Sequence, residues 1–331
     1  MLQKKKLSVI TALIILCLVI FSACGSPVPE EERETFESGL TVNFIDVGQG
    51  DSIFIRLPDG KNVLIDCGYN DEKIKENIFA FFSDYGVEKL DYLILTHPDN
   101  DHIGNAKSII ENYEIGRLYH PYIIENLLGL FLEYKQAYNL ALEKSIECCV
   151  SDCYDFIKGE DYFLSFLSPM PSSFKDGIYA ELNKLAEPTD ALINNLSPII
   201  YLEYKDVSFL FTGDAEFSQE QLALENVNSY LFKSNLKFYG IEFNLDRIDY
   251  LKVAHHGSKD STGSEFLSRL NPSNAIISVG GDNVYGHPSS QVIERIIKAN
   301  PDCNLYRTDV CGNICVNVNE EGAVTLFKQS Q

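Results

Sequence analysis

The stretch Leu93-Ile94-Leu95-Thr96-His97-Pro98-Asp99-Asn100-Asp101-His102 decides how the rest of this chain is interpreted. An apolar run typical of a buried strand stops at Leu95, and potential metal ligands follow at once: His97, Asp99, Asp101 and His102. A buried strand that leads into a loop rich in histidine and aspartate is a common way to hold a metal site on a rigid scaffold. The chain has only six histidines and two lie here, so we interpret the loop as metal-binding rather than as an ordinary polar surface loop.

Length and composition set limits on the class of protein. The chain has 331 residues, of which 45% are hydrophobic, enough for one large α/β domain or two small ones with a packed core. The formal net charge of -21 gives a surface that repels polyanions, which argues against a general nucleic-acid coat protein. It does not exclude an enzyme whose bound cations reverse the local field.

The N-terminus has the features of a targeting segment. Three lysines at 4–6 precede an apolar run from Leu7 to Phe21, and small residues precede Cys24, as in a bacterial lipoprotein signal. We expect residues 1–23 to be a signal peptide, Cys24 to be lipidated, and 24–39 to be an acidic, proline-containing linker. An uncleaved membrane anchor is the alternative, although about 15 apolar residues are few for a bilayer. Either way, the folded domain, expected over 40–331, lies outside the cytoplasm at a membrane.

The nine cysteines contain no Cys-x-x-Cys pair, which disfavours a zinc ribbon or a thioredoxin-like motif. Two groups are close in sequence, and a disulfide within either is one interpretation, small buried apolar side chains the other. The groups are Cys148, Cys149 and Cys153, and Cys303, Cys311 and Cys315.

The order of elements predicts an α/β protein with two sheets. Three short strands, expected over 40–46, 52–57 and 62–66, precede the first helix over 71–85, which indicates an antiparallel start. A second set of strands and helices follows the central region, with a long helical pattern over 217–247. Its other expected elements are strands over 198–204, 207–212, 250–254 and 274–279, helices over 264–270 and 290–299, and a closing β segment over 304–328.

Three apolar strands end at ionisable residues. The strand of the opening stretch leads into His97 to His102, and the other two end at Asp214 and at the pair His255-His256. In layered α/β proteins such strand ends gather along one edge, where binding sites are built. Two divalent ions a few ångströms apart need a bridging carboxylate, and Asp214 has two oxygens to share. A histidine later in the chain, His287, lies in a loop of the same kind.

These motifs resemble the metallo-β-lactamase fold superfamily, and more closely the soluble hydrolase domain of the competence protein ComEC. The resemblance covers nearly the whole chain after the linker and implies a four-layer αββα sandwich. The membrane-channel part of ComEC is absent, so DNA transport by this chain alone is not implied. The motifs that carry the resemblance are Asp46-Val-Gly-Gln-Gly-Asp51, His97-Pro-Asp-Asn-Asp-His102, Asn194-Asn195-Leu-Ser197, Phe211-Thr-Gly-Asp-Ala-Glu216, His255-His-Gly-Ser258, Ser278-Val-Gly280, Tyr285-Gly-His-Pro288 and Tyr306-Arg-Thr-Asp309.

The resemblance implies a set of site residues. On a strand His255 and His256 would point to opposite faces, so we expect only one to ligate and favour His255. The implied metal ligands are His97, Asp99, Asp101, His102, Asp214 as the bridge, and His255. Asp101, His256 and His287 are expected to take part in catalysis, and Asn195, Ser197 and Ser258 to contact the substrate.

Asp99 occupies a position where the wider superfamily usually has histidine. Carboxylate in place of imidazole makes a harder site, which shifts the preference from zinc towards manganese or magnesium. We therefore expect two divalent ions, Mn²⁺ or Zn²⁺, with Mg²⁺ as a further candidate. Oxygen-rich two-metal sites suit phosphodiester cleavage.

The sequence thus predicts an extracytoplasmic, lipid-anchored, metal-dependent phosphodiesterase or nuclease. It would cleave DNA, single-stranded DNA included, or another phosphodiester by means of a hydroxide activated by two metals. The alternatives are a metal-dependent esterase or lactonase, and a non-catalytic module that binds a metal or ligand. No protein partner is implied.

Overall fold

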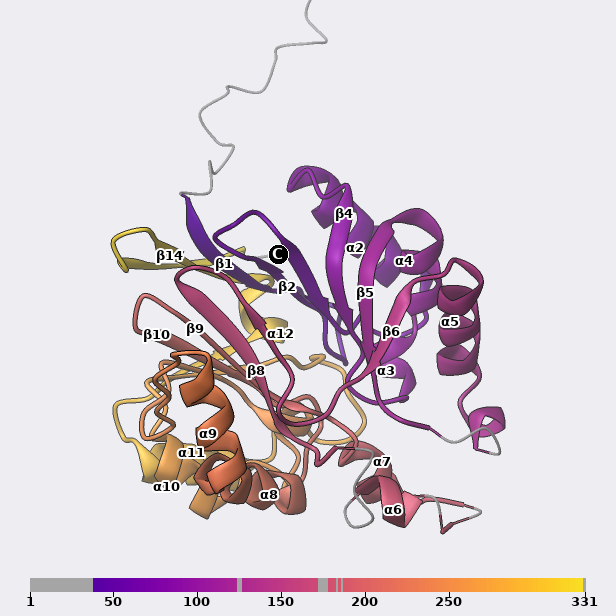
Figure 1. Cartoon of the computed structure of the whole chain (residues 1–331). Coiled ribbons are helices and arrows are strands. Elements are labelled where there is room, and N and C mark those ends of the chain that lie inside the picture. The colour runs from indigo at the N-terminus through magenta and orange to yellow at the C-terminus, as the bar shows by residue number, and fades with distance from the viewer. Residues whose placement is uncertain (1–37, 124–126, 172–177, 183, 186, 330–331) are drawn as a thin grey trace, which may run out of the picture. The chain divides into compact units, whose positions relative to one another are not determined.

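The computed structural model describes residues 38–123, 127–171, 178–182, 184–185 and 187–329, which form two β-sheets with helices outside them (Figure 1). The expected signal peptide, Cys24 and most of the expected linker lie outside the described residues. Within the described ranges, no helix has both the length and the apolar character that a membrane span requires.

The first sheet has eight strands and joins both ends of the described chain. In spatial order they are β15 (Val324–Lys328), β14 (Ile314–Asn319), β1 (Gly39–Phe44), β2 (Ile53–Arg56), β3 (Asn62–Ile65), β4 (Lys89–Ile94), β5 (Glu114–His120) and β6 (Glu147–Val150). Strands β1, β2 and β3 pair antiparallel, as the sequence predicts, and the sheet continues parallel through β4, β5 and β6.

The second sheet has seven strands and carries the later part of the chain. In spatial order they are β13 (Asn304–Arg307), β12 (Asn274–Ile277), β11 (Tyr250–Lys252), β10 (Val207–Phe211), β9 (Ile199–Tyr204), β8 (Tyr162–Ser168) and β7 (Phe156–Lys158). The closing β segment is divided between the sheets: β13 pairs with β12, the short helix α12 (Thr308–Cys311) follows, and β14 pairs with β1.

Helices cover the outer face of each sheet, which gives the four layers of an αββα sandwich (Figure 1). The first sheet is covered by α2 (Glu72–Asp84), α4 (Ala106–Asn112) and α5 (Leu132–Glu143). The second is covered by α8 (Phe217–Asn228), α9 (Tyr230–Phe238), α10 (Ser264–Leu270) and α11 (Ser290–Ala299). The single helical pattern expected over 217–247 is therefore α8 and α9 followed by an irregular segment.

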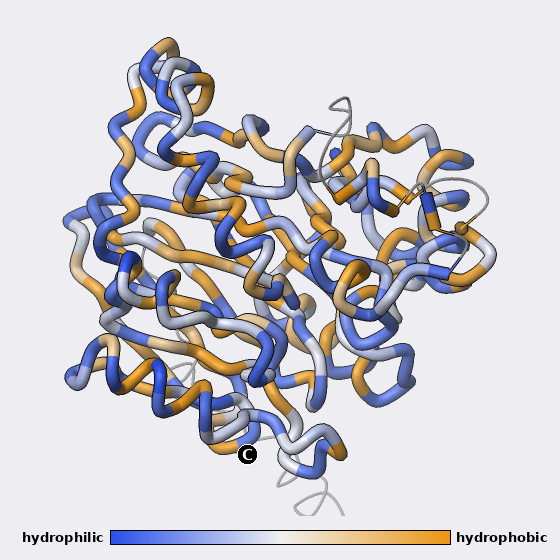
Figure 2. The backbone as a smooth tube through the Cα atoms, turned by 90° about the horizontal axis from the view of Figure 1, so that it is seen from below, coloured by the Kyte–Doolittle hydropathy of each residue, from blue (hydrophilic) through white to orange (hydrophobic). Residues whose placement is uncertain are grey.

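The strands read as continuous apolar runs because both faces of each sheet are buried. In β3, Val63 and Ile65 point into the core between the sheets, whereas Leu64 points into the core beneath the outer helices. Figure 2 shows the same pattern as apolar strands in the interior, with polar residues concentrated in the surrounding helices and loops. No disulfide joins the cysteines of either group in the described part of the chain, which favours the interpretation of both groups as small apolar side chains.

Candidate metal centre

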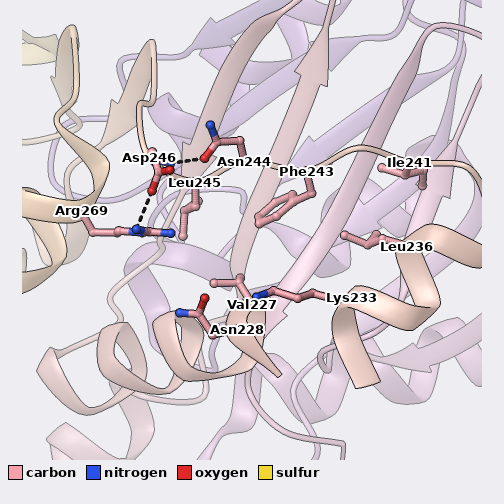
Figure 3. Close-up of a pocket in the computed structure, with 10 residues that line it drawn as sticks. All are labelled: Val227, Asn228, Lys233, Leu236, Ile241, Phe243, Asn244, Leu245, Asp246 and Arg269. Carbon is pink, nitrogen blue, oxygen red and sulfur yellow. Dashed lines mark hydrogen bonds and ion pairs between the residues drawn. The ribbon is translucent and has the colours of Figure 1, made fainter. Parts of the chain in front are cut away.

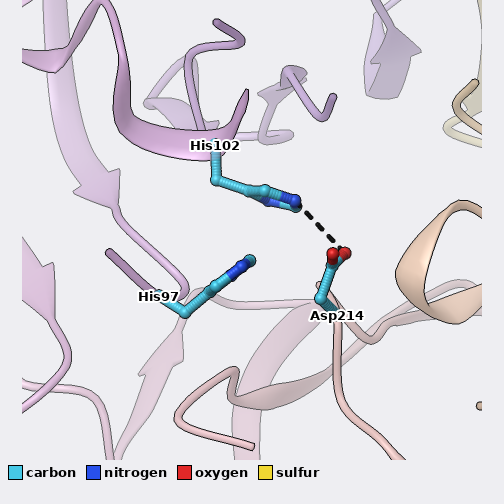
Figure 4. Close-up of side chains that lie close together, drawn as sticks. All are labelled: His97, His102 and Asp214. Carbon is cyan, nitrogen blue, oxygen red and sulfur yellow. Dashed lines mark ion pairs between the residues drawn. The ribbon is translucent and has the colours of Figure 1, made fainter. Parts of the chain in front are cut away.

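Three strand ends meet at one edge of the sandwich. The loop after β4 leads into the short helix α3 (Asn100–Ile103), and Asp214 follows β10. A short turn, η3 (Ala254–Gly257), follows β11 and carries the histidine pair. Figure 4 shows His97 and His102 from the first sheet and Asp214 from the second sheet pointing toward one another.

His102 is at the centre of the cluster. Its Nε2 atom lies 3.2 Å from Asp214 Oδ1 and 3.2 Å from His256 Nε2. His256 Nε2 lies 3.4 Å from Asp101 Oδ2, on the same short helix as His102. Ligand atoms of two triplets, His97–His102–Asp214 and Asp101–His102–His256, lie within 4.8 Å of one another. The arrangement thus offers two adjacent groups of metal-binding atoms.

His97 has one ring nitrogen engaged and one unused. Its Nδ1 lies 3.1 Å from Thr96 Oγ1 and 3.2 Å from Ser197 Oγ, whereas its buried Nε2 has no hydrogen-bond partner among the described residues. The nearest carboxylate oxygen, Asp99 Oδ2, is 3.5 Å from that Nε2. Asp51 Oδ1 is also buried without a hydrogen bond from the described residues, and Asp214 Oδ1 has only its ion-pair neighbours His102 and Lys252. Native proteins seldom leave such atoms unsatisfied, so these residues fit bound cations.

The electrostatics of the cluster favour positive charge. Burial opposes a charge on His102, but the carboxylates of Asp214 and Asp66 outweigh it and hold the pKa of His102 well above its usual value. Burial likewise favours a neutral Asp214, yet His256, His102 and His255 hold the pKa of its carboxyl well below the usual range. A bound divalent ion would supply the positive charge that these carboxylates attract.

The two adjacent histidines lie in a turn, not on a strand. His255 and His256 have φ angles of 50° and 52°, in the left-handed region that non-glycine residues rarely adopt. The turn brings their Nε2 atoms to 3.6 and 3.5 Å from Asp214 Oδ2. Our expectation that they face opposite ways is therefore wrong, because it assumed strand geometry. His256, which is buried, belongs to the Asp101–His102 triplet, whereas His255 lies nearer the surface.

Asp66, which follows β3, contacts the ring nitrogen of His102 that faces away from the cluster. Its Oδ2 lies 2.7 Å from His102 Nδ1 and accepts a hydrogen bond from Thr96 Oγ1, and its Oδ1 accepts one from the Thr96 backbone N–H. Because an ionised carboxylate only accepts, it fixes the proton of His102 on Nδ1 and turns Nε2 toward the cluster. Such a carboxylate–histidine pair is the usual support of a metal-binding imidazole.

A buried lysine lies beside the cluster. Lys252, at the end of β11, is fully buried and its Nζ lies 2.5 Å from Asp51 Oδ2 and 3.9 Å from Asp214 Oδ1. It also donates a hydrogen bond to the carbonyl of Gly213. Asp51 itself lies 3.6 Å from His256 Nδ1. Lys252 thus neutralises Asp51 and fixes the turn that presents Asp214.

The β1–β2 loop packs tightly against the ligand helix α3. Gly50 has a φ of 136°, and a side chain there would collide with the carbonyl of Asp101. The backbone N–H of Asp51 donates to that same carbonyl at 3.2 Å. Only glycine allows this close approach, which positions Asp101 beside His256.

The expected substrate contacts are largely buried. Ser197 Oγ is fully enclosed between His97 Nδ1 and the Asp214 N–H, and Asn195 Oδ1 accepts a hydrogen bond from the Glu216 N–H. Ser258 is also buried and receives a long hydrogen bond from the Asp260 N–H. These positions favour support of the ligands; contact of the three residues with substrate stays a prediction.

His287 lies at the rim of the cluster. Its ring is 5.7 Å from the ring of His255, centroid to centroid. Partial burial, with His255 and His256 nearby, lowers the pKa of His287 to about 4. The ring contact with His255 thus joins His287 to the cluster.

One cavity in the structure lies elsewhere. A pocket of about 340 Å³ is lined by α8, α9, the irregular segment after α9, and Arg269 of α10 (Figure 3). Its charged lining includes Arg269 paired with Asp246 at 2.6 Å, and none of the cluster residues lines it. It therefore has no part in the chemistry of the cluster.

Glu220 of α8 anchors the loop that follows the histidine pair. It is buried and accepts hydrogen bonds from the backbone N–H groups of Thr262 and Gly263. Burial raises the pKa of Glu220 from 4.5 to about 7, although those N–H groups and Arg295 lower it. The loop is thus tied to a carboxyl that changes charge near neutral pH.

Substituting Glu220→Gln is expected to change the pH dependence of stability. Between about pH 4.5 and 7 the unfolded wild-type chain loses the Glu220 proton while the folded chain keeps it, so its free energy of unfolding falls as pH rises. The free energy of unfolding of the variant lacks this slope. From pH 5 to pH 8, the stability of the variant relative to wild type should therefore rise by on the order of 2 kcal/mol. Urea unfolding at both pH values measures this; equal slopes would contradict it.

Three residues of the centre were not among the expected site residues: Asp51, which appeared only as part of a motif, Asp66 and Lys252. Asp66 directly follows an apolar strand, so the criterion that selected Asp214 also selects it. Lys252 gives no such signal, because it stands inside an apolar run where a lysine usually points to solvent.

The fold is that of a known class. Residues 45–281 match the Metallo-beta-lactamase superfamily, and the chain belongs to that superfamily of metal-dependent hydrolases, whose fold binds divalent ions, often two. This confirms the resemblance seen in the motifs.

Within the superfamily, the chain is similar to competence proteins. It is 32% identical to ComE operon protein 3 of Bacillus subtilis (strain 168), over 91% of this chain and 35% of the relative. It is 28% identical to Recombination protein 2 of Haemophilus influenzae, over 83% of this chain and 28% of the relative. The chain thus spans about a third of the length of these curated relatives.

Solved structures that match the chain include CmlA, a diiron β-hydroxylase from Streptomyces venezuelae, at 14% identity and a TM-score of 0.45. That match covers 88% of this chain and 55% of CmlA. The metallo-β-lactamase fold protein YhfI from Bacillus subtilis matches at 11% identity and a TM-score of 0.43, over 87% of this chain and 99% of YhfI.

Proposed function

We propose that this chain is an extracytoplasmic phosphodiesterase that uses two divalent ions, Mn²⁺ or Zn²⁺ with Mg²⁺ as a further candidate, and that single-stranded DNA is among its substrates. The observation that carries the proposal is the donor set around Asp214. Carboxylates are as numerous as imidazoles there, which suits hard ions and the oxygen-rich chemistry of phosphoryl transfer. The similarity to competence proteins supports a nucleic-acid substrate.

Different residues of the chain would hold the two ions. His97 and Asp99 would hold one ion, Asp101, His102 and His256 the other, and Asp214 would bridge them. Bound ions supply positive charge for phosphoryl oxygens and an activated water. His256 takes the ligand position for which we first favoured His255, because its Nε2 faces Asp101.

His255 and His287 would then serve the substrate. Both are partly exposed on the rim, and their rings lie next to each other. Imidazoles in this position can donate hydrogen bonds to the phosphate oxygens that the ions do not hold. The lipid anchor through Cys24 remains part of the proposal and would keep the enzyme at the membrane.

Removing and restoring metal tests the proposal. The full-length chain, dialysed against chelator, should not cleave bis(p-nitrophenyl) phosphate or a single-stranded oligonucleotide, and added Mn²⁺ should restore cleavage of both. p-Nitrophenyl acetate and a simple lactone serve as comparison substrates. Hydrolysis of these esters alone would replace the proposal by an esterase or lactonase, and hydrolysis of nothing would leave a binding module.

A further inference from the structure

The loop from Gly280 to Pro288 carries an exposed aromatic side chain next to the metal centre. Tyr285 is 68% exposed, and its ring stacks on the ring of His287 at 5.8 Å and 19°. His287 in turn faces His255, whose Nε2 is 3.6 Å from Asp214. Two ring-to-ring contacts, His255 with His287 and His287 with Tyr285, therefore connect the expected bridging carboxylate to Tyr285.

The loop is held firmly in place. Asn283 donates hydrogen bonds from its side chain to the carbonyls of Gly280 and His287, and its Oδ1 accepts one from the His287 N–H. Gly280 is itself in close contact with the β1–β2 loop at Gln49. A rigid loop that exposes a tyrosine loses little entropy when a ligand stacks on it, which is what a binding platform requires.

We infer that Tyr285 is a substrate-positioning residue on which a nucleobase of the DNA strand stacks. The inference rests on the proposed phosphodiesterase activity and names the part of the substrate that the enzyme recognises. One face of the ring lies on His287 and most of the side chain is open to solvent, so a second flat ring can complete the stack.

The distance to the cluster places the stacked base beside the reacting nucleotide rather than on it. Successive nucleotides of a strand are about 3.4 Å apart along a duplex axis and farther apart when extended. Two ring-to-ring steps therefore correspond to a base about one to three nucleotides from the scissile phosphate. Stacking is tolerant of base identity, which suits an enzyme for single strands of any sequence.

The test compares two substrates that differ only in their bases. In the full-length chain with Mn²⁺, Tyr285→Ala should lower kcat/KM on a short oligothymidylate by roughly 10-fold, mostly through KM. It should leave kcat/KM unchanged on an abasic oligomer with the same phosphates. Tyr285→Phe should restore the wild-type value, and Tyr230→Ala, at an 88% exposed tyrosine of α9, is the matched control that should change neither.

The outcomes separate the inference from the proposed function. If wild type cleaves both oligomers and Tyr285→Ala affects them equally or not at all, stacking is overturned while the phosphodiesterase stands. If wild type cleaves neither oligomer, the proposed function fails and the inference fails with it.

Discussion

Replacing Lys252 by methionine is expected to lower the free energy of unfolding by about 3–5 kcal/mol, because it removes the cation nearest to the buried carboxylate of Asp51. Lys252 is fully buried, and Asp51 beside it has only 2% of its side chain exposed. In a chain of this size the loss corresponds to a fall in Tm on the order of 10 °C. Thermal unfolding in the presence of chelator measures it, because bound metal cannot then compensate for the missing cation.

Two further variants make this result specific. Lys205→Met removes a surface pair with Asp161, whose atoms are 2.8 Å apart, and should cost no more than about 1 kcal/mol. Adding Asp51→Asn to Lys252→Met removes the buried carboxylate that has lost its lysine and should recover part of the lost stability. Equal unfolding temperatures for Lys252→Met and Lys205→Met would show that the buried pair contributes nothing.

Replacing Asp66 by asparagine is expected to weaken metal binding by about 10- to 100-fold. The carboxylate accepts from Thr96 through both oxygens and fixes His102 with Nε2 toward Asp214. An amide has only one accepting oxygen, so it cannot keep all of these bonds, and the imidazole loses its fixed orientation. Isothermal titration of Mn²⁺ into chelator-treated protein gives the affinity.

The matched control for Asp66 is Asp249→Asn. Asp249 also lies at a strand end and accepts hydrogen bonds from the Ser208 backbone and hydroxyl, but it belongs to the opposite end of β11 from the cluster. Its replacement should leave Mn²⁺ affinity unchanged. Equal affinities for Asp66→Asn and wild type would mean that Asp66 does not orient His102.

The order of elements was enough to predict an α/β protein with two sheets, and the resemblance carried by the motifs added the four-layer sandwich. Strands such as β3 are continuous apolar runs because both of their faces are buried. Helix α2 begins where the sequence predicts, with Asp71 accepting hydrogen bonds from its first N–H groups. The division of the closing segment between sheets could not be predicted. Pairing of Gly39 with Asn319 joins residues 280 positions apart, and no local pattern encodes such a contact.

The candidate ligands were predictable because ionisable residues at strand ends are conspicuous, and His97, His102 and Asp214 do meet in space. The roles of the adjacent histidines were not, because they depend on two left-handed backbone conformations that histidine does not favour by itself. Lys252 was missed for a related reason: its nearest charged partner is Asp51, a residue 201 positions earlier in the chain.

The centre also explains how so acidic a chain could act on a polyanion. The net charge of -21 opposes the approach of DNA, but the Asp51 charge is already cancelled by Lys252. Divalent ions held by the remaining carboxylates would make the cluster locally attractive to phosphate. Cleavage of long strands should therefore weaken with salt more than cleavage of a small phosphodiester.

The most direct measurement is cleavage of a 5′-labelled single-stranded oligonucleotide by the full-length chain with Mn²⁺, compared with Asp214→Asn under the same conditions. We expect shorter labelled products with wild type, none after chelation, and none with Asp214→Asn, which should keep its fold by circular dichroism. Undiminished cleavage by Asp214→Asn, or an intact oligonucleotide with metal-loaded wild type, would contradict this expectation.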